Sequence, residues 1–242
     1  MTFTLLPVVD VSQGHTLDLQ RGTADLNQES ACAFATASQL QAQGTTWLHI
    51  VDHDAAKHRG NNAKLLTKIM QELNVQVELT GGIDNEAAIH NGLALGVHQI
   101  VIGAVALENP HWLPGIFQRH ADKLAVALAV HQRDGQWRTS STAVLPDGGD
   151  LWEVLERLDA YGCRRFILTE PEHSGGITND YCDLLRDAAA ATEATIVAGS
   201  GMTNVADIQQ VASYAHEGVR AALLRQNWSN QQVNLVEAFA CL

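Results

Sequence analysis

The chain has 242 residues, of which 46% are apolar, and a formal net charge of −12. This length and apolar content are enough to bury one large core. The negative charge argues against binding to nucleic acid or to anionic membrane surfaces. It also opposes long-range attraction of a phosphorylated ligand, so a phosphate site would depend on local dipoles.

The start of the chain and its cysteines suggest a compartment. The first four residues, Met-Thr-Phe-Thr, contain no basic segment and lead directly into a strand-like pattern, so we expect no signal peptide. No apolar run approaches the roughly 20 residues needed to cross a bilayer. The four cysteines are scattered without a Cys-x-x-Cys pair and are predicted to be reduced thiols. We therefore expect a cytoplasmic protein, with a monomer as the plausible state.

Apolar runs alternate with helical patterns along the whole chain. The predicted strands are residues 5–11, 47–51, 75–79, 99–102, 124–130, 165–168, 195–198 and 221–224, and amphipathic stretches between them include 31–43, 62–73 and 85–95. Strands that are apolar almost throughout are buried on both faces, as in parallel sheets. Eight β-then-α units predict an α/β fold, a single (β/α)8 TIM barrel over residues 1–242. An open doubly wound sheet is the structural alternative.

One predicted helix has a clear start and stop. Asp150 precedes the apolar positions of residues 151–158 and can cap them, with Glu153 as the capping-box partner. Gly162 follows as a stop signal. This pattern predicts an outer helix of the barrel.

A segment of the chain is repeated. Glu-Leu-Thr-Gly-Gly-Ile-Asp-Asn at 78–85 recurs as Val-Ala-Gly-Ser-Gly-Met-Thr-Asn at 197–204, which is 119 residues further on. Each copy lies between an apolar run and a helical pattern, the usual setting in which backbone N–H groups hold a phosphate. We therefore predict a half-barrel repeat with two anion sites. The same displacement carries Asp10 onto Ala129, so an acid present in one half is absent from the other.

The chemistry of a barrel lies where its strands end. A first phosphate site is predicted at Thr80, Gly81, Gly82 and Gly103, because glycine lets the backbone approach a phosphate closely. A second is predicted at Gly199, Ser200, Gly201 and Arg225, whose guanidinium could supply positive charge. The alternative for both is a pair of ordinary turns, with Arg225 pointing to solvent.

Candidate acid–base groups also follow strands. Asp10, walled by apolar residues, could serve as a general base, or it could be a structural residue that binds loop amides. The loop of residues 169–176 contains three more candidate acid–base groups, Glu170, Glu172 and His173. The alternative is that these charged side chains are only solvated.

Two groups of residues contain side chains that could bind a metal. These are His49, His53, Asp54 and His58, and the wider set of Asp52, His131, Glu170 and His173. Neither group shows a His-x3-His spacing on a helix or an HExxH motif, so we predict no metal. The sequence also lacks a Walker A motif, a dinucleotide fingerprint and a GxSxG motif, and we expect no cofactor.

Several segments together resemble a known family, the phosphoribosyl isomerases of histidine biosynthesis, in particular the actinobacterial branch called phosphoribosyl isomerase A. The segments are Leu-Pro-Val-Val-Asp-Val at 6–11, Trp-Leu-His-Ile-Val-Asp at 47–52, Asp-Ala-Ala at 54–56, Arg-Gly-Asn-Asn at 59–62, residues 75–83, residues 106–110, and residues 147–159 followed by Gly162-Cys163. The match covers essentially the whole chain.

The resemblance implies a cofactor-free (β/α)8 enzyme that converts an aminoaldose phosphate to an aminoketose phosphate by an Amadori rearrangement. In this family a general acid opens the ribose ring and a general base moves a proton from C2. The histidine-pathway substrate has two phosphates, and the actinobacterial branch can also isomerise phosphoribosyl anthranilate, which has one. Carried over by position, Asp10 matches the first catalytic Asp and Thr169 a Thr near the substrate. The phosphate turns match Thr80, Gly81, Gly82, Gly103 and Gly201, and we add Gly175 to them.

The chain departs from the family pattern at several strand ends. Ser174 stands in place of the second catalytic Asp, and Ala129 in place of an Asp after the fifth strand. Asp18 replaces an Arg that contacts the substrate. Further replacements are Thr142 and Val144 for an Arg and a Trp, Ala104 for a Thr, and Arg225-Gln226 for Gly-Lys.

Three functions therefore stay open. The first is an isomerase of histidine or tryptophan biosynthesis, whose substrate range could be narrowed to phosphoribosyl anthranilate alone. The second is a non-catalytic barrel that binds a sugar phosphate or a protein. The third is an enzyme of changed chemistry that uses Glu170, Glu172, His131 and His173. Asp10 and the Thr80-Gly81-Gly82 turn favour the first.

Overall fold

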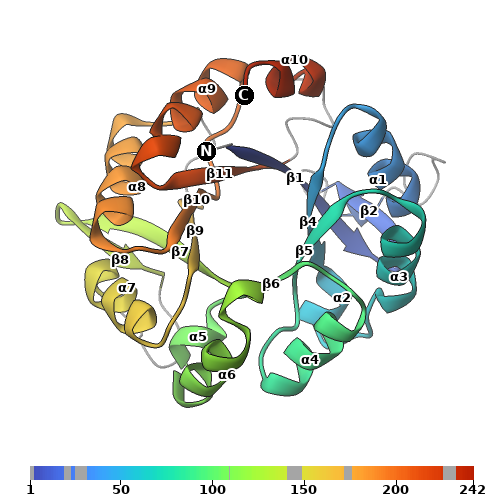
Figure 1. Cartoon of the computed structure of the whole chain (residues 1–242), viewed down its shortest axis with the longest axis horizontal. Helices are drawn as coiled ribbons and strands as arrows, with labels where there is room; N and C mark the ends of the chain where they lie inside the picture. Colours follow the sequence, from blue (N-terminus) through green and yellow to red (C-terminus); the bar gives the residue numbers. More distant parts are fainter. Residues whose placement is uncertain are drawn as a thin grey trace.

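The computed structural model describes residues 3–18, 23–24, 32–108, 110–140, 149–171, 176–225 and 233–242. Within this part of the chain, eight parallel strands form a closed ring (Figure 1). In order around the ring they are β1 (Thr4–Ser12), β4 (Trp47–Asp52), β5 (Gln76–Thr80), β6 (Gln99–Ile102), β7 (Leu124–Arg133), β9 (Arg165–Thr169), β10 (Thr195–Ala198) and β11 (Val219–Leu224).

The ring is closed by β11, which pairs with β1 in parallel from Thr4 opposite Ala221 to Pro7 opposite Leu224. This pairing confirms the predicted (β/α)8 barrel, and the open doubly wound alternative is wrong.

Helices surround the ring of strands (Figure 1). They are α1 (Ala33–Ala42), α2 (His53–Ala56), α3 (Ala63–Glu72), α4 (Glu86–Ala94), α5 (Val105–Glu108), α6 (Leu113–His120), α7 (Leu151–Ala160), α8 (Asn179–Ala191), α9 (Val205–Ser213) and α10 (Leu235–Ala240). Short 3₁₀ helices occupy Pro110–Trp112, Ala121–Lys123 and Tyr214–Glu217. Among the helices described, none combines the length and the apolar character that a membrane crossing requires.

The core has two layers because the strands of the ring are buried on both faces. One cluster fills the inside of the ring with Leu6, Val8, Val101, Ala125, Ile167, Val197, Ala221 and Leu223. A larger cluster, to which Leu5, Val9 and Val11 contribute, packs the outside of the strands against the helices. Side chains alternate between the two faces of a strand. Asp10 therefore shares the inward phase of Leu6 and Val8 and lies at the carboxyl-terminal mouth of the barrel.

The repeated turn is followed by matching helices in the two halves of the chain. Helices α4 and α9 have the same length and are displaced by the same 119 residues as the sequence repeat. Asn85 caps α4 by accepting from the amide of Ala88 at 2.9 Å, and Asn204 caps α9 by accepting from Asp207 at 3.0 Å. The backbone angles of the two cap residues agree within 6°. The repeat therefore preserves turn geometry as well as sequence.

Two hairpins were not predicted. Strand β2 (His15–Asp18) returns from β1 and is followed by β3 (Thr23–Ala24), while β8 (Gln136–Thr139) returns from β7. The connecting pairs Gln13-Gly14 and Asp134-Gly135 have positive φ at both residues, as in the tight turns that favour hairpins. The Asp134-Gly135 pair is typical of a hairpin turn and could have indicated β8. The strand was not predicted because it is polar and forms no apolar run.

The predicted cap of α7 is confirmed in part. Asp150 accepts from the amides of Trp152 at 2.9 Å and Glu153 at 3.3 Å, and Gly162 follows the helix with a φ of +96°. The reciprocal bond predicted for Glu153 is absent from the described contacts, because its exposed side chain is left to solvent. The reciprocal capping box occurs instead at Asn204 and Asp207.

Candidate active site at the carboxyl-terminal mouth of the barrel

Asp10 is a buried carboxylate near the end of β1. Its Oδ1 atom lies 2.8 Å from Nε2 of His53, the first residue of α2. The side chain of Asp10 is 4% exposed and that of His53 is 22% exposed. In the part of the chain that the structure describes, the hydrogen bond of Asp10 is therefore made to an imidazole, rather than to the loop amides that a structural role predicted.

The other acids at the end of β4 are held by structural bonds. Asp52 caps α2 through the amides of Asp54 and Ala55, at 3.1 and 3.0 Å, and accepts from the amide and side chain of Asn62. Asp54 accepts from the amide of Gln13 at 2.6 Å and also from Ser12 and Asn62. The bond from Gln13 is the main reason why the pKa of Asp54 is lowered. Asp54 thus fastens α2 to the end of β1, and Asp52 holds α2 against Asn62.

His49 belongs to a buried charge network that crosses the barrel. Its Nδ1 lies 2.7 Å from Oε1 of Glu78, and the other oxygen of Glu78 accepts from Nε of Arg165 at 3.1 Å. Glu78 is fully buried, and it comes from β5 whereas Arg165 comes from β9, which is not a neighbouring strand. Burial by itself would raise the pKa of Glu78, but His49 and Arg165 together hold it below its ordinary value.

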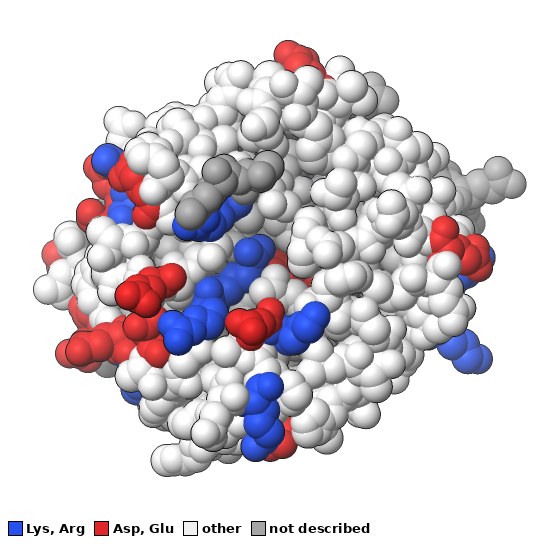
Figure 2. All heavy atoms as spheres, viewed as in Figure 1, with Lys and Arg blue, Asp and Glu red and all other residues white. Residues whose placement is uncertain are grey.

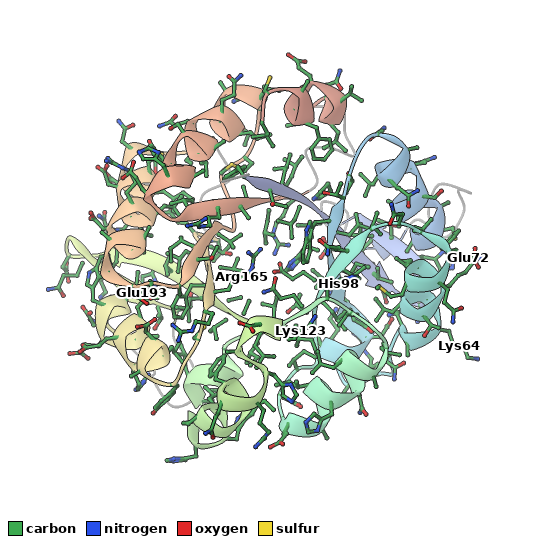
Figure 3. All side chains as sticks on the ribbon, in the orientation of Figure 1. Lys64, Glu72, His98, Lys123, Arg165 and Glu193 are labelled. Atoms are coloured by element: carbon green, nitrogen blue, oxygen red, sulfur yellow. The ribbon has the colours of Figure 1, made fainter. Side chains whose placement is uncertain are left out.

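This network points toward the end of the barrel opposite the mouth. In Figure 3, Arg165, Lys123 and His98 lie near the middle of the ring, and each stands at or just before the start of its strand. Figure 2, in the same orientation, shows Lys and Arg side chains gathered in the middle of this face. The charges therefore belong to the closed, amino-terminal floor of the barrel rather than to the candidate site.

The residues considered as metal ligands do not converge. His53 is bound to Asp10, His49 to Glu78, and His58 lies 3.8 Å from Asp84. Among the residues whose placement is described, no group of three or more His, Cys, Asp or Glu side chains is arranged to hold a metal ion. His173 lies outside the described residues, so the wider set stays untested.

The first predicted phosphate site is brought together as a pocket of about 220 Å³ at the ends of β5 and β6. Its walls include Thr80, Gly81, Gly82, Gly103 and Ala104. Asp84 and His58 also line it, with Nε2 of His58 3.8 Å from the carboxylate of Asp84, which opposes an anion. The predicted residues thus share one small, backbone-rich hollow.

The glycines of this turn let it pack against the preceding βα turn. Gly81 has a φ of +106°, and a Cβ atom there would overlap the backbone carbonyl of Asp52. Gly82 has a φ of +68°, and a Cβ atom would come within 2.7 Å of the carbonyl oxygen of Ala55. These glycines therefore have a packing role that is independent of any phosphate.

Replacing Gly81 by alanine should destabilise the protein by about 3 kcal/mol, because left-handed strain and overlap with rigid backbone add together. The matched control is Gly96→Ala, since Gly96 has a φ of +87° but no atom within 4 Å of an added Cβ. This control should lose only about 1 kcal/mol. Denaturant unfolding of the two variants measures the difference, and equal losses would contradict the packing role.

In the second predicted phosphate turn, the first amide, that of Gly199, is already bonded within the protein. The amide of Gly199 donates to the carbonyl of Leu168 at 2.7 Å and to the hydroxyl of Tyr181 at 3.0 Å. Ser200 Oγ accepts from the amide of Glu170 at 3.0 Å. Gly199 would therefore serve a phosphate by its missing side chain rather than by its N–H. Arg225 is exposed at the end of β11.

On the opposite side of the mouth, the inward positions near the ends of β7 and β9 are Ala129 and Thr169, and the half-buried Glu170 directly follows β9. Ala129 pairs with Thr169 across these strands. Ser174 and Gly175 lie outside the described residues, as do Glu172, His173, Thr142, Val144 and Gln226; only the backbone of Asp18 is described. The assignments of these residues stay predictions.

Sequence reasoning missed the role of His53. It was weighed only as a metal ligand, although it directly follows a strand end. Its position directly after a strand indicated that it lies at the mouth of the barrel, but its partner Asp10 is 43 residues earlier in the chain. Only the pairing of β1 with β4, which sets Asp10 opposite Val51, brings the two side chains together.

Comparison with known proteins identifies similar chains. The model of the family described as "Histidine biosynthesis protein" matches residues 4–225. A 1-(5-phosphoribosyl)-5-((5-phosphoribosylamino)methylideneamino) imidazole-4-carboxamide isomerase of Corynebacterium efficiens is 43% identical over 98% of this chain and 97% of its own length. The enzyme of the same name from Corynebacterium diphtheriae is 43% identical over the full length of both chains. Phosphoribosyl isomerase A of Mycobacterium tuberculosis is 38% identical over 100% of this chain and 99% of its own.

Proposed function

Because this chain belongs to the histidine biosynthesis protein family, we propose that it is an isomerase that converts a phosphoribosyl aminoaldose to an aminoketose by an Amadori rearrangement. The substrate is the one in the names of the Corynebacterium relatives, and phosphoribosyl anthranilate is a second substrate. The reaction proceeds without a cofactor, and the protein acts as a cytoplasmic monomer.

The placement of Asp10 relative to the first phosphate pocket carries this proposal. In the sheet register Asp10 pairs with Val51 of β4, and Val51 pairs with Thr80 of β5. The Asp10 carboxylate and the Thr80 turn therefore lie at the same height along the barrel axis, two strands apart. Strands are spaced roughly 5 Å apart, which gives a separation of about 10 Å. A ribosyl phosphate held in the pocket can therefore extend its sugar carbons toward a buried base.

The half-barrel repeat supports a substrate with two phosphates. The Corynebacterium relatives are named for a molecule with two phosphoribosyl groups, and this chain has one glycine turn in each half. In the proposed complex Thr80, Gly81, Gly82 and Gly103 bind one phosphate, and Gly175, Gly199, Ser200, Gly201 and Arg225 surround the other. Thr169 lies beside the sugar, and Asp10 removes the proton from C2.

The test is turnover of both aminoaldose phosphates by the purified protein, followed as formation of the aminoketose. Turnover of the imidazole carboxamide substrate supports the histidine-pathway reading, and turnover of phosphoribosyl anthranilate alone narrows the function to tryptophan synthesis. No turnover of either by folded protein would overturn the proposal. Calorimetric titration with both substrates then tests the alternative of a barrel that binds a sugar phosphate without converting it.

A further inference from the structure

Ring opening and removal of the C2 proton need two proton transfers, and Asp10 is the acid among the described inward positions at the strand ends. A proton must reach the ring oxygen as the ring opens, and another must leave C2. The inward positions at the ends of β5, β7 and β9 are Thr80, Ala129 and Thr169, none of which is an acid. This inference rests on the proposed function and concerns how one carboxylate serves both steps.

His53 is placed to assist Asp10 and has no other bond among the contacts described. Its Nε2 is 2.8 Å from the carboxylate, a normal hydrogen-bond length for a charged or neutral imidazole. The carboxylate is almost fully buried, and the imidazole is partly open to solvent. The pair therefore joins a buried base to a group that exchanges protons with water.

The titratable groups next to Asp10 and His53 form hydrogen bonds with other residues or lie in solvent. Asp54, next in α2, is bound by Gln13, Ser12 and Asn62, while Asp52 caps the helix. His49 is bound to Glu78, and Lys57, which follows α2, is exposed. Asp10 and His53 consequently form a separate couple within the charges that β1, β4 and α2 present at this place.

We propose that Asp10 and His53 share one proton and that this couple performs both transfers. In the first step, the proton leaves the couple for the ring oxygen while the C1–O bond breaks and the nitrogen lone pair forms a C=N bond. In the second step, the Asp10 carboxylate takes the proton from C2, the C–H electrons form a C1=C2 bond, and the C=N electrons return to nitrogen. One proton leaves and one returns, so the couple ends as it began. The enaminol so formed becomes the aminoketose when its C2 hydroxyl loses a proton to water, the C2=O bond forms, and C1 takes a proton from water.

The imidazole gives the couple a second proton-binding atom, Nε2, within hydrogen-bond distance of the carboxylate. The shared proton can therefore rest between the two groups and leave through Asp10. His53 acts through Asp10 and is therefore a positioning and proton-storing residue.

Two substitutions of His53 separate proton storage from simple hydrogen bonding. His53→Leu removes the bond to Asp10, and His53→Gln keeps an N–H donor but cannot store a proton. We expect kcat to fall about 100-fold or more in both variants, with KM changed by less than about 3-fold. Restoration of kcat by glutamine would show that orientation suffices and would overturn the shared proton. Unchanged kcat in both variants would also overturn it.

The control is His90→Gln on the outer helix α4, where the imidazole is half exposed and lies 3.8 Å from Glu86. It should leave kcat unchanged, and thermal unfolding shows that each variant is folded. As a readout independent of activity, ¹⁵N spectra of the imidazoles should show both ring nitrogens of His53 protonated in the wild type at pH 7, and this signature should be lost in Asp10→Asn. A neutral His53 imidazole in the wild type would contradict the couple.

The failure of this inference can be told from the failure of the proposed function. If the wild-type protein converts neither substrate, the proposed function fails and the couple has no reaction to serve. If the wild type is active and the His53 variants match it, only the shared proton is overturned.

Discussion

Replacing Asp10 by asparagine should abolish isomerisation of both aminoaldose phosphates while leaving the barrel folded. Asparagine has nearly the same shape, and its carbonyl oxygen can still accept from Nε2 of His53, which lies 2.8 Å from the carboxylate. What is lost is the ability to take a proton from C2. General acid–base catalysis contributes about 10²–10⁴-fold per group. Because the couple serves both transfers, we expect a loss of kcat at the upper end, about 10⁴-fold.

The measurement is kcat and KM for each substrate at equal amounts of folded wild-type and Asp10→Asn protein. A 10⁴-fold loss corresponds to about 5.5 kcal/mol of transition-state stabilisation. KM should stay within a few-fold, since the pocket lined by Thr80, Gly81 and Gly82 is unchanged. Turnover within ten-fold of the wild type would exclude Asp10 as the base and would direct attention to Glu170 and His131.

Replacing Glu78 by glutamine should destabilise the folded protein by about 3–5 kcal/mol at pH 7. The carboxylate is fully buried between His49 and Arg165, at 2.7 and 3.1 Å. Removal of one partner from a buried charge network leaves the other charge without compensation, and this desolvation cost dominates. Urea unfolding should therefore shift strongly. Glu72→Gln is the matched control, because Glu72 lies exposed at the end of α3 and points away from the barrel (Figure 3).

The same variant should change how stability depends on pH. The pKa of Glu78 is lowered in the folded protein relative to its ordinary value of 4.5. A group with a depressed folded pKa contributes stability above its unfolded pKa, and this contribution is lost as the pH falls below that value toward the folded pKa. Between pH 6 and pH 3 the wild type should therefore lose more stability than Glu78→Gln. Parallel profiles for the two proteins would contradict the role of the ionised carboxylate.

The fold could be predicted because its signals are local. Each barrel strand is a short apolar run, since both of its faces are buried, and the observed strands lie within a few residues of the predicted ones. The helix caps Asn85, Asp150 and Asn204 are also local, since each side chain binds an amide two or three residues ahead. The strand β8 was not predicted because its two faces are not both buried, and its sequence is therefore polar rather than an apolar run.

The candidate site was predictable only in its outline. The Thr80-Gly81-Gly82 turn and Gly103 could be grouped from the sequence because parallel strands end at one edge, and they do line one pocket. The partners of the charged residues could not be found in this way. His49, His53, Asp54 and His58 cluster in sequence and suggested a shared metal. In the structure His49 is bound to Glu78, His53 to Asp10 and Asp54 to Gln13, while His58 lies 3.8 Å from Asp84.

The sequence by itself determined the barrel and its glycine turns, because apolar runs and turn residues are patterns of neighbouring residues, and a repeated segment is found by comparing the chain with itself. The tertiary structure decided which charges meet. Asp10 reaches His53 across 43 residues, and Glu78 reaches Arg165 across 87. These contacts depend on the register between strands and on closure of the ring, which place side chains at one level of the barrel whatever their separation along the chain.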